Sequence, residues 1–313
     1  MIIKGHNNSS TAPKGLTRKM PLYIISFAHS RYWQNQALYT SVADQLHAAL
    51  QEFVPVSETI HIRICSENDL DHFLPDEAGG AALFAPMSGG VQPWMLKAAA
   101  GFDGVGIFPG YDPGCADREV AEELLKQNSA PAAIEMYSVL RQQGKSCMLA
   151  TDASKFISLY RAARAAGRLR HSRLLHIGGT EPWVMSSSKD GGVYKRLTGI
   201  EVVETALEEL YEVFEEVDDK DAAALAQRYI KEASAVSEPG EGDIREAARL
   251  VIAVERLLER YEGDGVCVAC FSLLAELHTT SCMALAFLND HPAYVGGCEG
   301  DLDSAVTLAL VKA

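Results

Sequence analysis

The chain has 313 residues, which at roughly 150 residues per domain is enough for about two domains. It carries 28 Lys plus Arg against 42 Asp plus Glu, a net charge of −14, and such a field repels polyanions such as nucleic acids. Its composition is 48% hydrophobic and 22% charged, and no run approaches the roughly 18 apolar residues that a membrane span requires. These numbers predict a soluble globular protein that neither binds nucleic acid nor crosses a membrane.

The cysteine count and the first residues bear on location and on the start of the fold. Seven cysteines, an odd number without a secretory leader, predict reduced thiols and a cytoplasmic protein. Residues 1–19 are rich in Asn, Ser, Thr, Lys and Gly, so we expect a disordered N-terminal extension. Met20 directly precedes the first apolar run and is an alternative start.

From residue 22 onward, apolar runs alternate with segments of helical periodicity. Such alternation is typical of a parallel sheet that helices cover on both faces. Residues 20–170 are therefore predicted to form a first doubly wound, Rossmann-like α/β domain. The expected strands are 22–28, 59–65, 81–85, 104–108 and 147–150, and the expected helices are 34–53, 130–143 and 153–166.

The same pattern restarts after a basic segment, residues 161–173. Its arginines could form a nucleic-acid patch, but they also fall at a helix end, where cations suit the helix dipole, and we favour the second interpretation. Residues 171–313 are predicted to form a second doubly wound α/β domain. Strands are expected at 174–177, 200–203, 265–270 and 293–295, and helices at 193–197, 206–217, 219–233, 243–261, 282–288 and 302–312.

A glycine-rich acidic segment, residues 296–301, lies between an expected strand and the first turn of the last helix. Ligands of open α/β sheets gather beyond the carboxyl ends of the strands. Glu299 and Asp301 there offer hard oxygens suited to Mg²⁺ or Mn²⁺. The alternative is that Asp301 caps the helix and Glu299 merely occupies a position that favours acids. The spacing does not distinguish the two.

Four cysteines of the second domain suggest a second kind of site. Cys267, Cys270, Cys282 and Cys298 could supply four thiolates to zinc, since C-x-x-C is a common half-site. However, residues three apart on one strand point to opposite sides of the sheet, so Cys267 and Cys270 could share a metal only if the strand ended between them. Buried structural cysteines are the favoured interpretation.

Several further residues follow expected strands and could line a pocket. The turns at 88–90 and 178–180 could hold an oxyanion or phosphate, although neither is a complete phosphate-binding motif. His29 and His278 are candidate pocket histidines, with exposed loop histidines as the alternative. The three tryptophans could either pack in the core or wall a sugar site: Trp33, Trp94 and Trp183.

Several segments together resemble a known family. Residues 282–290 (CMALAFLND) and 298–301 (CEGD) are similar to the metal-site region of the L-fucose isomerase-like branch of the L-fucose and L-arabinose isomerase superfamily. Three further segments agree with that family in the same order: 88–90 (SGG), 128–135 (NSAPAAIE) and 172–179 (SRLLHIGG) followed by Pro182-Trp183. The resemblance covers about residues 84–313.

The resemblance implies two stacked α/β domains in a homo-oligomeric enzyme of carbohydrate metabolism. The implied activity is that of an intramolecular oxidoreductase, an aldose–ketose isomerase that converts a small-molecule sugar through a cis-enediol with Mn²⁺ or Mg²⁺. Carried over to this sequence, the Glu of the motif, Glu299, would bind the metal and move the proton between C1 and C2. Asp301 would hold the metal, a metal-bound water or the loop.

The sequence also departs from the family pattern. Family members continue past this helix to a second carboxylate ligand and a β-rich domain that brings a histidine ligand, whereas this chain ends at Ala313. We therefore expect a truncated isomerase-like protein that holds Mn²⁺ or Mg²⁺ weakly by itself, or one whose site a second chain completes. The alternative is a non-catalytic sugar-binding or assembly module derived from that family.

Overall fold

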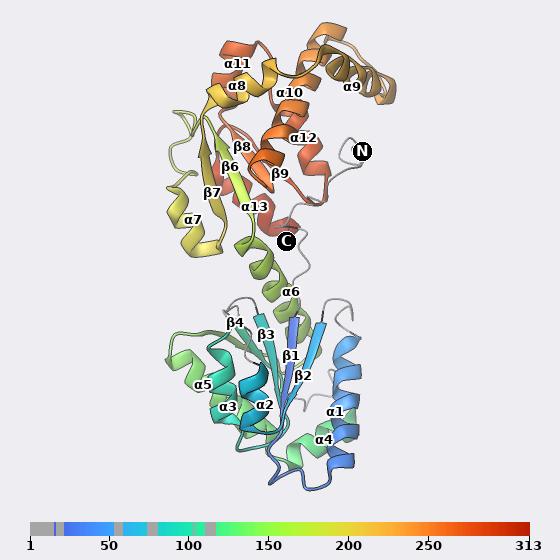
Figure 1. Cartoon of the computed structure of the whole chain (residues 1–313), viewed down its shortest axis with the longest axis vertical. Helices are drawn as coiled ribbons and strands as arrows, with labels where there is room; N and C mark the ends of the chain where they lie inside the picture. The colour runs from blue at the N-terminus through green and yellow to red at the C-terminus, as the bar shows by residue number, and fades with distance from the viewer. Residues whose placement is uncertain (1–15, 17–21, 53–58, 74–80, 103, 110–116) are drawn as a thin grey trace. The chain divides into compact units, whose positions relative to one another are not determined.

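The computed structural model describes residue 16 and residues 22–52, 59–73, 81–102, 104–109 and 117–313. The chain divides into an N-terminal unit, Lys19–Gly167, and a C-terminal unit, Arg168–Ala313, to which Met1–Arg18 also belong. Each unit has a parallel sheet with helices on both of its faces, so the predicted fold class, two doubly wound α/β units, is confirmed (Figure 1). The proposed start at Met20 lies outside the described residues.

The N-terminal unit is built on a five-stranded parallel sheet of order β2-β1-β3-β4-β5. Its strands are β1 (Leu22–Phe27), β2 (Thr59–Ile64), β3 (Ala81–Pro86), β4 (Gly104–Ile107) and β5 (Ser146–Leu149). Its helices are α1 (Gln36–Gln51), α2 (Glu67–Phe73), α3 (Gln92–Ala99), α4 (Arg118–Lys126), α5 (Ser129–Gln142) and α6 (Ala153–Arg170), the last of which continues into the C-terminal unit.

Alternation along the central strands sends side chains to both faces of this sheet. Ile24 and Leu83 pack with α1, α4 and α6, whereas Ile25 and Phe84 pack with α2, α3 and α5. These strands read as nearly continuous apolar runs because both of their faces are covered.

The C-terminal unit is built on a four-stranded parallel sheet of order β7-β6-β8-β9. Its strands are β6 (Arg173–Ile177), β7 (Glu201–Thr205), β8 (Gly265–Val268) and β9 (Val295–Gly297). Its helices are α7 (Gly191–Thr198), α8 (Leu207–Glu215), α9 (Asp219–Glu232), α10 (Glu241–Arg260), α11 (Cys270–Leu277), α12 (Cys282–Asp290) and α13 (Leu302–Lys312). None of the helices described in either unit is long and apolar enough to cross a membrane.

Two hydrophobic cores cover the faces of the second sheet. One packs α8 to α12 against it, and the other packs α7, α13 and the end of α6. Leu16 is buried in the second core, and its amide donates to Asp264 Oδ1 at 3.3 Å. Leu16 is the one described residue of the segment 1–19, which was expected to be disordered; the rest of that segment lies outside the described residues, and the expectation stays a prediction.

Two strand predictions near the candidate site need correction. The strand expected at 265–270 ends at Val268, and Cys270 begins helix α11, which was not predicted. The strand expected at 293–295 is shifted to Val295–Gly297. Its glycines serve close packing rather than a turn, since a Cβ at Gly296 would lie 2.9 Å from Leu285 Cα and one at Gly297 2.8 Å from the Ala305 Cβ.

Candidate functional site

The candidate site lies at the carboxyl edge of the second sheet, where the loops after β6, β8 and β9 meet. Strands β7 and β8 both follow β6 in the chain but lie on opposite sides of it, so the order in which strands are added to the sheet reverses at β6. Open α/β sheets bind ligands outside the strand ends at such a point. The structure thus brings the predicted segment 298–301 and the turn at 178–180 together, and Gly300 shows how closely: a Cβ on it would lie 2.1 Å from the Gly179 carbonyl oxygen.

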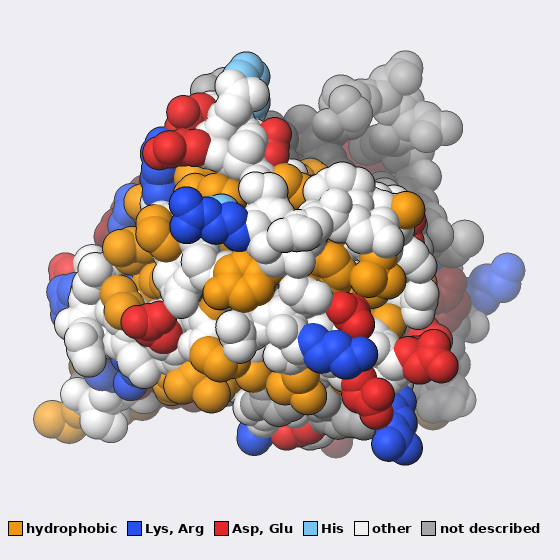
Figure 2. Space-filling model, turned by 90° about the horizontal axis from the view of Figure 1, so that it is seen from below, with side chains coloured by type: hydrophobic (Ala, Val, Ile, Leu, Met, Phe, Trp, Pro, Cys, Tyr) orange, Lys and Arg blue, Asp and Glu red, His pale blue; other side chains and the backbone are white. Residues whose placement is uncertain are grey.

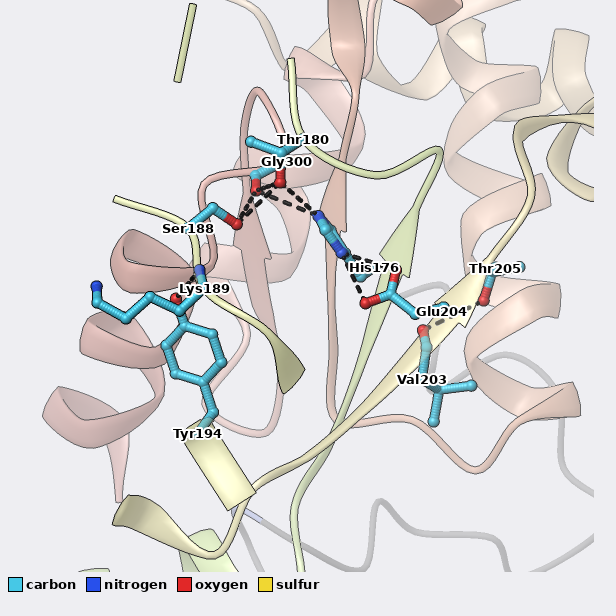
Figure 3. Close-up of polar contacts among 9 residues, drawn as sticks. All are labelled: His176, Thr180, Ser188, Lys189, Tyr194, Val203, Glu204, Thr205 and Gly300. Carbon is cyan, nitrogen blue, oxygen red and sulfur yellow. Dashed lines mark hydrogen bonds and ion pairs between the residues drawn. The ribbon is translucent and has the colours of Figure 1, made fainter. Parts of the chain in front are cut away.

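The carbonyl group of Gly300 is the centre of a polar network (Figure 3). It accepts from Thr180 Oγ1 at 3.1 Å, Ser188 Oγ at 3.2 Å and His176 Nε2 at 3.2 Å. The two hydroxyl groups also lie 2.8 Å from each other. Three side chains from strand β6 and the loop after it therefore fix one peptide of the β9–α13 loop.

His176 connects this network to the neighbouring strand. Its side chain is buried on β6, and its Nδ1 lies 2.9 Å from the carboxylate of Glu204 on β7, which stands directly opposite it in the register (Figure 3). The other ring nitrogen faces the Gly300 carbonyl group, so each nitrogen meets an oxygen that accepts a hydrogen bond. The pair of contacts holds the ring in one orientation.

Glu299 is presented by this rigid loop. Its backbone is left-handed, with φ of 58°, and its carbonyl oxygen accepts from Glu181 N at 3.1 Å. Its carboxylate accepts from Trp183 Nε1 at 2.8 Å, and the Trp183 ring meets Phe271 edge to face, with centroids 5.1 Å apart. Trp183 and Phe271 are 55% and 51% exposed, so the acid is hydrogen-bonded to one accessible aromatic ring, which packs against a second.

Glu181 joins the loop after β6 to helix α11. Its buried carboxylate accepts from Phe271 N and Ser272 N, both at 2.9 Å, and from Ser272 Oγ at 3.3 Å. It therefore satisfies free amide groups of the first turn of α11, where the helix dipole also favours an anion. This contact fixes the position of Phe271 relative to Trp183.

Asp301 takes the capping role that the sequence left open. Its Oδ1 accepts from Ser304 N at 3.0 Å and its Oδ2 from Ser304 Oγ at 2.7 Å, at the start of α13. In the described part of the chain, no group of three or more His, Cys, Asp or Glu side chains is placed to hold a metal ion. The described residues therefore do not fit a complete Mn²⁺ or Mg²⁺ site, and a metal role for Glu299 and Asp301 stays a prediction.

The cysteines are arranged differently from a four-thiolate site. Strand β8 does end between Cys267 and Cys270, yet Cys267 is fully buried, while Cys270 Sγ lies 3.2 Å from Cys298 Sγ. Burial and the contact with Cys270 raise the pKa of the Cys298 thiol to about 12. Since the described residues contain no metal-holding group of three, the zinc alternative gains no support.

The other predicted pocket residues lie in different places. His278 ends α11 with a left-handed φ of 52°, so a whole helix separates it from the strand it was expected to follow. Trp33 is a core residue whose Nε1 donates to the Met87 carbonyl oxygen. His29 does follow β1, and its ring stacks on Trp94 with centroids 5.3 Å apart.

The carboxyl edge of the first sheet is the second place where loop residues meet. His29 N donates to Ser88 Oγ at 2.8 Å, which joins the loops after β1 and β3. Strands of this sheet run downward in Figure 1, so Figure 2 looks onto that edge from below. Among the described residues on this face, hydrophobic side chains lie between areas of backbone and other uncharged side chains. Charged side chains are scattered rather than gathered in one patch.

Sequence reasoning missed His176, Glu181, Ser188 and Glu204. His176 and Glu204 lie inside strands, and only the register of β6 with β7 makes them neighbours. Glu181 had a usable signal, because an acid soon after the double-glycine turn lies at the carboxyl edge of a strand.

No family model matches this sequence, and no curated protein shows significant similarity to it.

Proposed function

We propose that the chain is a sugar isomerase-like protein of carbohydrate metabolism, in which Glu299 is the carboxylate that meets a small aldose or ketose. The observation that carries the proposal is the hydrogen bond from the Trp183 indole N–H to the Glu299 carboxylate, with the accessible ring of Phe271 packed against Trp183. Sugar rings stack their apolar C–H faces on such aromatic rings, while carboxylates accept from sugar hydroxyl groups.

The rigid loop suits a residue that transfers protons. The amide of Gly300 donates to the Val268 carbonyl oxygen, and the carbonyl oxygens of Glu299 and Gly300 both accept hydrogen bonds. These bonds fix the backbone that carries Glu299, and the Trp183 N–H orients its carboxylate. In the proposed reaction, Glu299 takes the proton from C2 of an aldose and returns it to C1, while the O2 proton moves to O1, which yields the ketose.

A divalent cation, as in the resembling family, would polarise the carbonyl and hydroxyl oxygens of the sugar. Of the two predicted ligands, Asp301 has both oxygens on Ser304, which leaves Glu299 as the available carboxylate. Manganese titration of the wild type and Glu299→Gln tests this role, and equal affinities would remove Glu299 as a metal ligand.

Sugar binding is tested by calorimetric titration with L-fucose, L-arabinose and the corresponding ketoses. Trp183→Ala removes the ring and the hydrogen bond to Glu299, so we expect affinity to fall roughly ten-fold. The matched control is Met185→Ala, in the same loop and 89% exposed, which should bind as the wild type does. Equal binding by both variants would contradict a sugar site at Trp183.

Isomerase activity is tested by following ketose formation from the same aldoses with Mn²⁺ present. Glu299→Gln should lower the rate by about 100-fold or more, because the base is lost while the shape is kept. Glu238→Gln, at an exposed position of the same unit, is the control. Absence of ketose formation by the wild type would refute catalysis by this chain.

A second candidate, a non-catalytic sugar-binding or assembly module, is favoured by one observation. Both carboxylate oxygens of Asp301, one of the two predicted metal ligands, accept from Ser304 at the start of α13. Binding that depends on Trp183, without ketose formation and without a difference between wild type and Glu299→Gln in Mn²⁺ affinity, would favour this module over the isomerase.

A further inference from the structure

The contact between Cys270 and Cys298 is not explained by a sugar site. Cys298 follows strand β9 directly, and Cys270 is the first residue of α11, two residues after strand β8. These strands are hydrogen-bonded neighbours, so the fold brings together two thiols that are 28 residues apart in sequence. Their sulfur atoms lie 3.2 Å apart and both thiols are free.

The surrounding contacts hold both sulfur-bearing segments in place. On one side, Glu181 binds the first turn of α11 through Phe271 N and Ser272 N. On the other, the Cys298 carbonyl oxygen accepts from Asp301 N, and Gly300 N donates to the Val268 carbonyl oxygen. These contacts fix the backbone that carries each cysteine, so the folded loops keep the two thiols within reach of each other.

The two thiols differ in accessibility, which suits a pair in which one thiol meets the oxidant and the other closes the disulfide. Cys298 is exposed, so a small oxidant can reach it, whereas Cys270 is only 7% exposed and lies behind it. We propose that Cys270 and Cys298 form a reversible redox pair, a modification site that closes to a disulfide beside Glu299. This proposal is independent of the sugar-binding function.

The oxidant class is a small disulfide, for example oxidised glutathione. Because the pKa of the Cys298 thiol is raised, the reaction is run at alkaline pH, where more of this thiol is ionised. The Cys298 thiolate then attacks one of the sulfur atoms of the small disulfide, forms a mixed disulfide and releases one glutathione thiolate. The Cys270 thiolate then attacks the Cys298 sulfur and releases the second. Two protein thiols are oxidised, one small disulfide is reduced to two thiols, and the two cysteine protons pass to the released thiolates through solvent. Closing the bond requires the sulfur atoms to approach to about 2.0 Å, a movement of roughly 1 Å from the contact distance.

Disulfides of this kind in reducing compartments are mostly transient and redox-sensing. Since Cys298 immediately precedes Glu299, oxidation would tie the loop that presents this carboxylate to the start of α11. The same bond would fix Phe271, the neighbour of Cys270, relative to that loop.

The test uses the full chain, reduced, freed of reductant and incubated with oxidised glutathione, after which remaining thiols are blocked. Cleavage after Glu and before Asp separates the cysteines into fragments 264–276 (Cys267 and Cys270), 277–289 (Cys282) and 290–299 (Cys298). We expect the disulfide between 264–276 and 290–299 to exceed every other disulfide roughly ten-fold, because the fixed contact raises the effective concentration of the partner thiol. Dithiothreitol should remove it.

Cysteine variants and an unfolded control test whether the disulfide joins Cys270 and Cys298. Cys298→Ser and Cys270→Ser should each abolish this disulfide, whereas Cys282→Ser, at an exposed cysteine of the same unit, should leave it unchanged. Because Cys298 is exposed, its serine variant should fold even where the buried one does not. In guanidinium chloride the selectivity should disappear. A dominant Cys282–Cys298 disulfide, survival of the link in Cys270→Ser, or equal selectivity in the unfolded chain would overturn the proposal.

Discussion

The two units share a strand order but connect their carboxyl edges with different chemistry. In each sheet the first strand along the chain, β1 or β6, lies between the second and the third. The described contacts between the loops after β1 and β3 involve neutral groups, namely His29 N with Ser88 Oγ and Trp33 Nε1 with the Met87 carbonyl oxygen. The loops of the second sheet are joined by hydroxyl groups and also by buried carboxylate contacts, above all that of Glu181.

The difference shows that the sheet layout does not decide where chemistry occurs. Both edges offer a reversal of strand order, which is where ligands bind in such sheets. Only the second edge, among the described contacts, combines an accessible acid, Glu299, with exposed aromatic rings and a loop whose peptides are hydrogen-bonded on both sides of Gly300. The loop residues rather than the sheet layout therefore distinguish the two edges.

The largest loss of stability is expected from a substitution of Gly300, at the carboxyl edge of the second sheet. A Cβ there would lie 2.1 Å from the Gly179 carbonyl oxygen and 2.6 Å from Thr180 Cα, at a left-handed φ of 68°. Both neighbours are backbone atoms, so Gly300→Ala should lower the free energy of unfolding of the C-terminal unit by about 3–5 kcal/mol, from backbone strain plus overpacking. Urea unfolding measures it.

Gly179→Ala is the matched control for Gly300→Ala. Gly179 has a similar φ of 76°, but nothing lies within 4 Å of its added Cβ. This substitution should cost about 1–2 kcal/mol, from the left-handed backbone alone. Equal losses in the two variants would mean that the loops after β6 and β9 are not in the close contact described.

Much of the fold could be predicted from the sequence, because buried parallel strands appear as apolar runs. The run at 22–28 and the last helix at 302–312 lie within one residue of β1 and α13. The helices that were missed, α2, α3, α4 and α11, have seven to nine residues, so each spans only about two helical turns and its period is weak. Length is not the whole reason, since α7, α8 and α12 are equally short and were predicted.

The candidate site was harder to predict, because its geometry depends on contacts across the sheet. Asp301 at a helix start carries its own signal and does cap α13. His176 with Glu204, by contrast, is set by strand register, and Cys270 with Cys298 by the pairing of β8 and β9. A single sequence contains no local trace of either pairing.

Acid should weaken the N-terminal unit through His47. Burial, with the nearby His61 and Arg63, lowers the pKa of His47 from 6.5 to about 4. Between these values the unfolded chain binds a proton that the folded one does not. Stability is therefore fully present above pH 6.5 and falls by about 3 kcal/mol as the pH approaches 4. Urea unfolding with hydrogen exchange in α1 measures this.

The His47 contribution is isolated by substitution. His47→Leu should flatten the fall between pH 6.5 and 4, since no proton can then be taken up at this position. His72→Gln, at an exposed histidine of the same unit, should leave the fall unchanged. An undiminished fall in His47→Leu would show that another group causes it.

Acid should have the opposite effect on the C-terminal unit through Glu255. Burial, with repulsion from Glu259, raises the pKa of Glu255 from 4.5 to about 7, and its Oε1 lacks a hydrogen-bond partner among the described residues. In this window the folded chain holds the proton. The contribution is therefore fully present below pH 4.5 and is lost as the pH rises through 7, by about 2 kcal/mol after allowance for partial solvent exposure.

Glu255→Gln should remove this loss and make the C-terminal unit more stable at pH 8, where Glu255 is charged. Glu259→Gln, at an exposed position one helical turn away, should retain most of it. Hydrogen exchange in α10, compared with exchange in α1, reports the two units separately. If both units respond to pH in the same direction, the contrast between them is wrong.

The smallest losses of stability are expected from removing one serine hydroxyl group at each edge, Ser88 for the first sheet and Ser188 for the second. Ser88 is fully buried, and its Oγ accepts from His29 N at 2.8 Å and donates to the Gly89 carbonyl oxygen at 3.1 Å. Ser88→Ala leaves the partly buried amide group of His29 without this acceptor, so it should cost about 1–2 kcal/mol. Ser188→Ala should cost about 0.5 kcal/mol or less, because the Gly300 carbonyl group keeps Thr180 and His176 as donors. Thermal unfolding of both variants measures the difference. Equal losses of stability in the two variants would mean that Thr180 and His176 do not compensate for the loss of the Ser188 hydrogen bond to Gly300.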